Sequence, residues 1–334
     1  MNYTKSEAKA ASRAQFRGVW AAIHTPFTTD YRLDEAGLRR NMRHYTDVLA
    51  VDGIFCAGTM GEFWALTKEE RKRVVEIVVE EARGKCKVIA HTGNHSPDET
   101  VDLTNHAATV GADFAVVINP YYPMADDARD EAIYQWFAYV AERTDIGIWM
   151  FDTPFSWVSL STEVTARIAK LENICGIKVS RPLDHYAQVD KLCGKEIVLS
   201  HPSETEFLHL IREHGMKVHM SSAAPFLMQV AGYRPMRDYA ELALAGRFDE
   251  ATKIRDGIQP LREVHEKWLR EPWLKRKVIP IAHLKGWAEL LGLAAGPVRP
   301  PLLQLTAGER AMLHADVTRV GLLSRLGAKA RVPA

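Results

Sequence analysis

The chain has 334 residues, of which 47% are hydrophobic and 25% are charged, the proportions of an ordinary globular protein. Its formal net charge is only +1, which argues against nucleic acid or an anionic membrane as a partner. No apolar run approaches the roughly 18 residues that cross a bilayer, and residues 1–17 lack the apolar core of a signal peptide. The four cysteines show no CxxC spacing. We therefore expect a cytoplasmic protein without a metal site.

Short apolar runs rich in β-branched residues recur along the chain and predict eight strands. They lie near residues 18–25, 53–59, 86–92, 114–120, 146–151, 174–180, 196–201 and 217–222. Amphipathic helical segments such as 34–50 and 67–83 separate most of them, and Thr67 with Glu70 forms a capping box for the second. Alternation of apolar strands with helices is typical of a parallel sheet covered by helices.

Eight such units predict an α/β fold, a (β/α)8 TIM barrel of about 200 residues. A doubly wound sheet is disfavoured because no G-x-G-x-x-G turn is present. After residue 225 the pattern becomes helical, with segments expected near 226–246, 248–270, 277–292 and 306–326. We divide the chain into an N-terminal polar segment (1–17), the barrel (18–245) and a C-terminal helical domain (246–334).

Lys178 stands in the apolar run "ICGIKVS", near the end of the sixth predicted strand. The active site of an α/β barrel lies at the carboxyl ends of its strands, so this lysine occupies a position where catalytic residues occur. A desolvated lysine has a lowered pKa and can attack a carbonyl as a free amine. Two structural explanations stay open: the side chain reaches water beyond the strand end, or it pairs with a buried carboxylate.

Three loops at other predicted strand ends carry candidate site residues. In "GTMGE", Gly58, Thr59 and the amide of Met60 could form an anion-binding nest, or the segment could be an ordinary glycine-containing loop. "NPYYP" contains Tyr122, which could relay protons or pack in an aromatic loop. "SSAAP" contains Ser222, where small side chains leave room for substrate.

Taken together, these motifs resemble the dihydrodipicolinate synthase/N-acetylneuraminate lyase family of class I, Schiff-base aldolases and dehydratases. The resemblance covers about residues 18–305 and rests on the ordered motifs "AAIHTPF", "GTMGE", "INPYYP", "GIKVS" and "LKGWAELLGLAAGPVRPPL". It implies a barrel with a C-terminal helical domain, a homo-oligomer (tetramer or dimer), and no metal or organic cofactor. It also implies a 2-keto acid as substrate.

Position by position, the resemblance assigns roles to three residues. Lys178 matches the lysine that forms the imine, and Thr59 with the amides around Met60 matches the pocket for the carboxylate of the keto acid. Tyr122 matches the tyrosine that completes a proton relay, in many members at the site of the neighbouring subunit.

The chain departs from the family pattern at two of its strand-end loops. Phe151 opens "FDTP" where most members have the tyrosine of Y-N-x-P, so the usual hydroxyl for proton transfer is missing. Met60 stands where many members have Thr or Ser; the hydratase–aldolases of the superfamily also have an apolar residue there. Asp152 replaces the usual asparagine, and we expect it to cap a turn.

Two histidines at strand ends are candidates to replace the missing acid–base group. His91 ends the third predicted strand and His24 the first, and a structural role stays open for both. Arg181, in the loop after Lys178, could bind a second carboxylate or simply be solvated.

The sequence therefore predicts a lyase, an aldolase or hydratase–aldolase, that acts on a pyruvate-derived 2-keto acid through a Schiff base on Lys178. A keto-deoxy sugar acid dehydratase, a dihydrodipicolinate synthase-like condensation and an imine-dependent decarboxylase are alternatives within the same chemistry. A protein that binds a keto acid without turning it over is the alternative of another class, because Phe151 cannot transfer protons.

Overall fold

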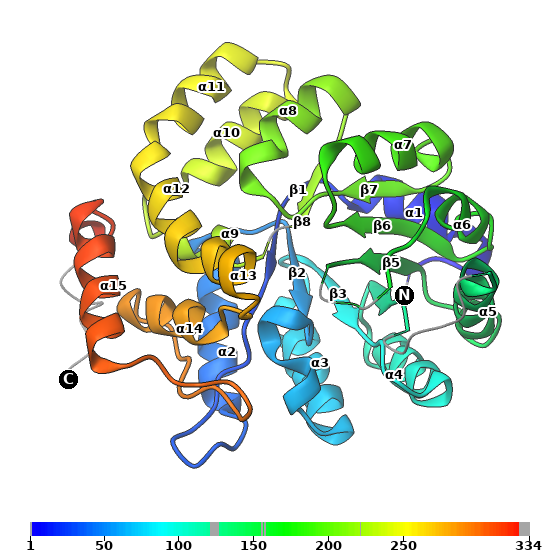
Figure 1. Cartoon of the computed structure of the whole chain (residues 1–334), viewed down its shortest axis with the longest axis horizontal. Coiled ribbons are helices and arrows are strands. Elements are labelled where there is room, and N and C mark those ends of the chain that lie inside the picture. The colour runs from blue at the N-terminus through cyan, green and yellow to red at the C-terminus, as the bar shows by residue number, and fades with distance from the viewer. Residues whose placement is uncertain (1, 121–126, 155, 157, 221, 327–334) are drawn as a thin grey trace. The chain divides into compact units, whose positions relative to one another are not determined.

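The structure, a computed structural model, describes residues 2–120, 127–154, 156, 158–220 and 222–326. Eight parallel strands close a barrel in sequence order (Figure 1). They are β1 Gly18–Ala22, β2 Gly53–Cys56, β3 Lys87–His91, β4 Phe114–Ile118, β5 Ile148–Asp152, β6 Ile174–Val179, β7 Val198–Ser200 and β8 Val218–Met220. All eight predicted strands and the barrel are confirmed.

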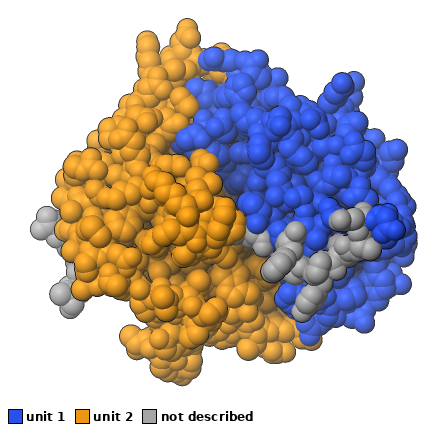
Figure 2. Space-filling view, viewed as in Figure 1, with its two compact units in different colours: residues 1–17, 87–220 blue, residues 18–86, 221–334 orange. Residues whose placement is uncertain are grey.

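The chain divides into two compact units, which Figure 2 colours separately. The first unit comprises residues 1–17 and 87–220 and contains β3 to β8. Its helices are η1 Lys5–Glu7, α1 Ala8–Gln15, α4 Pro97–Val110, α5 Arg129–Glu142, α6 Thr162–Ile168, α7 Leu183–Cys193 and α8 Glu204–His214. Helices α4 to α7 pack side by side in sequence order (Figure 1).

The second unit comprises residues 18–86 and 221–334 and contains β1, β2 and the C-terminal helices. Its helices before the C-terminal group are α2 Glu35–Arg43, η2 His44–Val48, η3 Thr59–Gly61, η4 Phe63–Ala65 and α3 Lys68–Ala82. The C-terminal group is α9 Ala224–Leu227, α10 Pro235–Leu244, α11 Phe248–Gly257, α12 Gln259–His265, η5 Glu266–Arg270, α13 Glu271–Arg276, α14 Ile281–Leu290, α15 Ala307–Arg319 and η6 Leu323–Arg325. The predicted domain boundary at residue 245 stays a prediction.

Local sequence explains several helix ends. The predicted capping box at Thr67 is present, with its hydroxyl accepting from the Glu70 amide. The helix expected over 226–246 is two helices, because the turn at Gly232 has a positive φ and Pro235 opens α10. None of the helices in the described part of the chain combines the length and apolar character that a membrane span requires.

The first residues of the chain form a helix that the polar composition did not predict. Ser12 on α1 accepts a hydrogen bond from the Trp149 indole at 3.1 Å, and the Phe16 ring lies 4.1 Å from that indole between centroids. Gly176, the partner of Trp149 in register, is what makes room, since a Cβ there would lie 2.2 Å from the indole ring. Helix α1 therefore packs beside β5 and β6, nearer to the amino ends of these strands than Lys178.

Candidate active site

Lys178 lies in a row of paired residues near the carboxyl ends of three strands in the first unit. Phe151 on β5 pairs with Lys178 on β6, and Lys178 pairs with Ser200 on β7. Paired residues of parallel strands point to the same face, so these three side chains lie on the face that Trp149 and Gly176 also occupy. This is the interior of the barrel, and Lys178 lies near the end of β6 as the sequence predicts; its catalytic role stays a prediction.

Burial makes the Lys178 amine unusual. Its side chain is 4% exposed, and desolvation lowers its pKa from 10.5 to about 7. Its Nζ lies 5.0 Å from the centroid of the Phe151 ring. The lysine therefore does not reach water beyond the end of the strand. About half of it is a free amine at neutral pH.

His91 belongs to the same unit and ends β3. The hydroxyl of the next residue, Thr92, lies 2.7 Å from that of Thr104 on α4, so Thr92 faces the helices and His91 faces the barrel interior. A Cβ at Gly93 would lie 3.3 Å from His91 Nε2, so a side chain at this position would crowd the imidazole. The orientation fits an acid–base role, which stays a prediction.

The "GTMGE" loop forms a tight 3-10 turn in the second unit. The Gly58 carbonyl accepts from the amides of Gly61 and Phe63, and these bonds do not use the amides of Thr59 or Met60. Thr59 is buried and Met60 half-buried. The anion-binding role of the Thr59 and Met60 amides stays a prediction.

Glu62 ends this loop in a left-handed conformation, with φ at 57°, and is completely buried. One carboxylate oxygen lies 2.6 Å from Lys285 Nζ on α14, and the other accepts from the Arg299 amide at 2.9 Å. Burial lowers the pKa of Lys285 to about 8, although Glu62 opposes the change. This buried ion pair, which the sequence did not predict, connects the loop to the C-terminal helices of its own unit.

His24 is held by other parts of the second unit. Its Nε2 lies 2.7 Å from the Ala294 carbonyl, and the Tyr45 hydroxyl lies 3.5 Å from its Nδ1. Burial lowers its pKa to about 4, so the imidazole is neutral and donates to that carbonyl. These contacts fit the structural role left open by the sequence; contact with substrate stays a prediction.

The structure says less about two further predicted site residues, Ser222 and Tyr122. The Ser222 carbonyl accepts from the Ala22 amide at 3.1 Å, which places Ser222 beside the end of β1 within its unit. Tyr122 lies outside the described residues. The described part of the chain holds no group of three His, Cys, Asp or Glu side chains arranged to bind a metal ion.

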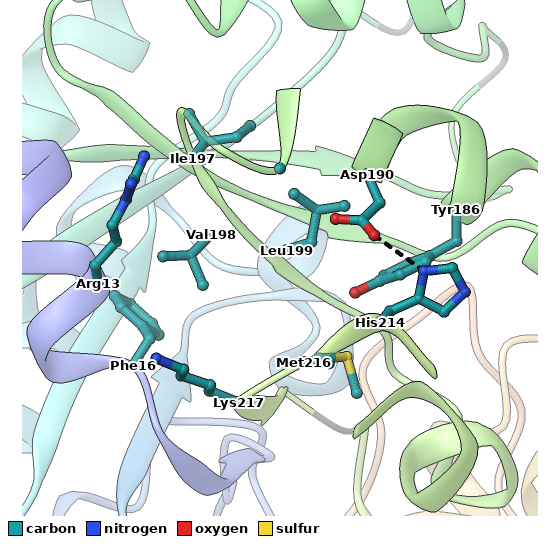
Figure 3. Close-up of a pocket in the computed structure, with 12 residues that line it drawn as sticks. Arg13, Phe16, Tyr186, Asp190, Ile197, Val198, Leu199, His214, Met216 and Lys217 are labelled. Carbon is teal, nitrogen blue, oxygen red and sulfur yellow. Dashed lines mark hydrogen bonds and ion pairs between the residues drawn. The ribbon is translucent and has the colours of Figure 1, made fainter. Parts of the chain in front are cut away.

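A cavity of about 180 Å³ opens at the other end of the strands of the first unit (Figure 3). Val198, which begins β7, and Lys217, which precedes β8, lie on its wall, together with Phe16 after α1. An ion pair between Asp190 and His214 at 2.9 Å borders it. It contains none of the predicted site residues.

Comparison with known proteins agrees with this arrangement. The model of the dihydrodipicolinate synthetase family matches residues 15–320. The 4-hydroxy-tetrahydrodipicolinate synthase of Methanothrix thermoacetophila is 32% identical over 314 residues, 92% of this chain and 98% of that protein. The protein of the same name from Nitrobacter hamburgensis is 31% identical over 327 residues, 94% of this chain and 100% of that protein.

Among solved structures, dihydrodipicolinate synthase from Aquifex aeolicus has a TM-score of 0.80 at 29% identity, covering 92% of this chain and 99% of that one. The family resemblance expected from the ordered motifs is thereby confirmed over most of the chain. The chain therefore belongs to the dihydrodipicolinate synthetase family, whose members are class I lyases that form a Schiff base.

Proposed function

We propose that this family member is an aldolase or hydratase–aldolase that acts on a pyruvate-derived 2-keto acid through an imine on Lys178. The observation that carries the proposal is the environment of the lysine: it is buried in the barrel interior, and its pKa of about 7 is due to desolvation. Such an amine is nucleophilic at neutral pH.

The chemistry follows from that amine. Its lone pair attacks the keto carbon, and loss of water leaves a protonated imine. A base removes the proton of the C4 hydroxyl, the C3–C4 bond breaks, and its electron pair passes to the imine, which releases an aldehyde and leaves an enamine. Protonation of the enamine and hydrolysis then return the lysine and release pyruvate.

Proton transfer is where this site differs from the expected relay. Phe151 puts a phenyl ring beside the Lys178 ammonium, and a phenyl ring neither donates nor accepts a proton. We infer that another group carries the proton, and His91 on β3 is our candidate, since it faces the barrel interior and is buried. General acid–base catalysis is worth about 10²- to 10⁴-fold in rate.

Condensation of pyruvate with an aldehyde is the second candidate, because the curated relatives described above are named 4-hydroxy-tetrahydrodipicolinate synthase. Phe151 and Met60 count against it. Assembly as a dimer or tetramer and a cytoplasmic location are proposed on the family resemblance alone.

The test incubates the protein with pyruvate and borohydride and weighs the intact chain and its peptides. We expect a reduced pyruvyl adduct on the Lys178 peptide and none in Lys178→Met. Turnover is then followed with aromatic and sugar-derived aldol adducts for the wild type, His91→Gln and Phe151→Tyr.

We expect His91→Gln to lower turnover by about 10²- to 10⁴-fold while adduct formation persists. Phe151→Tyr should raise the rate at which pyruvate condenses with an aldehyde if that reaction lacks only the relay hydroxyl. Absence of an adduct in folded protein would contradict the proposal. An adduct without turnover of any substrate would identify a binding protein.

A further inference from the structure

A buried charged cluster lies at the carboxyl end of β5, one residue beyond Phe151. Asp152 Oδ1 accepts from Nε and Nη2 of Arg181 at 2.9 and 2.7 Å. Its Oδ2 lies 3.4 Å from His185 Nε2 on α7. The Asp152 side chain is fully buried, whereas those of Arg181 and His185 are 14% and 23% exposed. A carboxylate so placed is stable only when paired.

The pair is ionic. Burial by itself raises the pKa of Asp152, but the nearby His185 and the hydrogen bonds from Arg181 outweigh burial and hold it below its ordinary value. Asp152 is therefore a carboxylate at neutral pH, and the two bonds to Arg181 are charge-assisted. The expectation that Asp152 merely caps a turn misses this partner.

Arg181 joins the ends of three strands. Besides Asp152, its Nη2 donates to the Thr153 carbonyl at 3.2 Å, so the guanidinium holds the end of β5. Its own carbonyl lies 3.0 Å from His201 Nε2, just after β7. Lys178 is three residues before Arg181, on β6 between these two strands. The segment that follows the lysine is thus held from both sides.

The cluster lies away from the place where substrate is expected to meet the lysine. Side chains alternate along a strand, so Asp152 points to the opposite face from Phe151, which lies beside Lys178. The Asp152 carboxylate also accepts, at 3.4 Å, from the amide of Leu160, in the segment that leads to α6. The guanidinium thus faces the outer side of the strands, which disfavours its use for a second substrate carboxylate.

We propose that Arg181 is a positioning residue that holds the carboxyl end of β6, and with it the Lys178 amine, in the place from which it attacks the keto acid. Asp152 and His201 are its two anchors. The inference rests on the proposed imine chemistry. Misplacement of a reacting group by about 1 Å can cost about 10²-fold in rate, which sets the size of the expected effect.

The experiment measures the rate of reductive trapping with pyruvate against pH for the wild type, Arg181→Gln, Arg181→Lys, Asp152→Asn and the double variant Asp152→Asn/Arg181→Gln. Arg167→Gln is the matched control, because Arg167 on α6 pairs with Glu131 at the exposed surface of the same unit. Thermal unfolding of each variant shows which of them are folded at the assay temperature.

We expect Arg181→Gln to lower the plateau rate by about 10- to 100-fold and leave the pH midpoint near 7, since burial and not Arg181 sets the Lys178 pKa. The lysine variant should recover part of the rate, because it keeps a cation beside Asp152. The double variant should be no slower than the slower single variant, because both substitutions break one contact. The control should match the wild type.

Three results would overturn the proposal. An unchanged plateau in folded Arg181→Gln excludes positioning. A shifted midpoint with an unchanged plateau assigns Arg181 an electrostatic role instead. A rate loss that follows only the unfolded fraction, with no recovery in Arg181→Lys, assigns it a purely structural role. Failure of the proposed function is distinct, because the wild type itself would then form no adduct.

Discussion

Raising the pH from 6 to 8 should accelerate imine formation by a factor that the structure determines. With a pKa of about 7, the free-amine fraction of Lys178 rises from about 9% to about 91%, an increase of about tenfold with a plateau above pH 8. A lysine with the ordinary pKa of 10.5 would gain about 100-fold over the same range and show no plateau.

The assay follows initial rates of trapping by cyanoborohydride, with excess pyruvate, by intact mass. Nα-acetyl-lysine under the same conditions provides the control. Its amine is solvated, and the reactivity of cyanoborohydride changes with pH in the same way in both reactions. The ratio of the two rates isolates the environment of Lys178 and should fall about tenfold from pH 6 to pH 8.

A ratio that stays constant across this range would show that Lys178 titrates as an exposed lysine does. That result would contradict the assignment of its low pKa to burial in the barrel. An unchanged adduct yield in Lys178→Met would instead show that trapping occurs at another amine.

Burial of Lys178 should also lower the free energy of unfolding. Its pKa is lower in the folded state than in the unfolded state, so the unfolded state binds more protons between about pH 7 and 10.5. Lys178→Met should therefore raise the free energy of unfolding by up to about 4 kcal/mol at pH 7. Urea unfolding should show that gain shrinking by about 3 kcal/mol at pH 9.5; a constant gain would contradict the cause. Lys285→Met leaves Glu62 buried without its cation and should lower the free energy of unfolding by about 3–5 kcal/mol, whereas a loss below about 1 kcal/mol would show that Glu62 is satisfied without the lysine. Burial lowers the pKa of both His24 and His265 to about 4. Each histidine should therefore lower the free energy of unfolding by up to about 3 kcal/mol as the pH falls from 6.5 to 4. The free energy of unfolding of the double variant His24→Gln/His265→Gln should depend less steeply on pH over that interval than that of the wild type. An equal slope would contradict the assignment of the two low pKa values to burial.

The strands and the candidate lysine could be predicted because their determinants are local. A run such as residues 114–118 consists of residues that fit a buried strand, and its spacing from the next run leaves room for one helix. Since such units wind into a barrel whose site lies at the strand ends, the place of Lys178 in the sequence already indicated its role. The capping box at Thr67 is local in the same sense.

Tertiary structure decided the features that depend on distant residues. Glu62 and Lys285 are far apart along the chain, and nothing in either neighbourhood shows that the two charges meet. The polar segment that forms α1 becomes a helix through its packing beside Trp149. The only sequence signal for Lys285 is its position in the apolar run "PIAHLKGW", where a lysine needs a partner.

The sequence by itself determined where the strands lie, that they form a barrel, and which lysine faces its interior, because periodicity and composition act over a few residues. Only the tertiary structure decided that the Lys178 amine has a pKa near 7, since desolvation depends on all the chain segments packed around it. It also decided that Asp152 holds Arg181. A pair of charges on adjacent strand ends becomes specific only when burial removes water as the alternative partner.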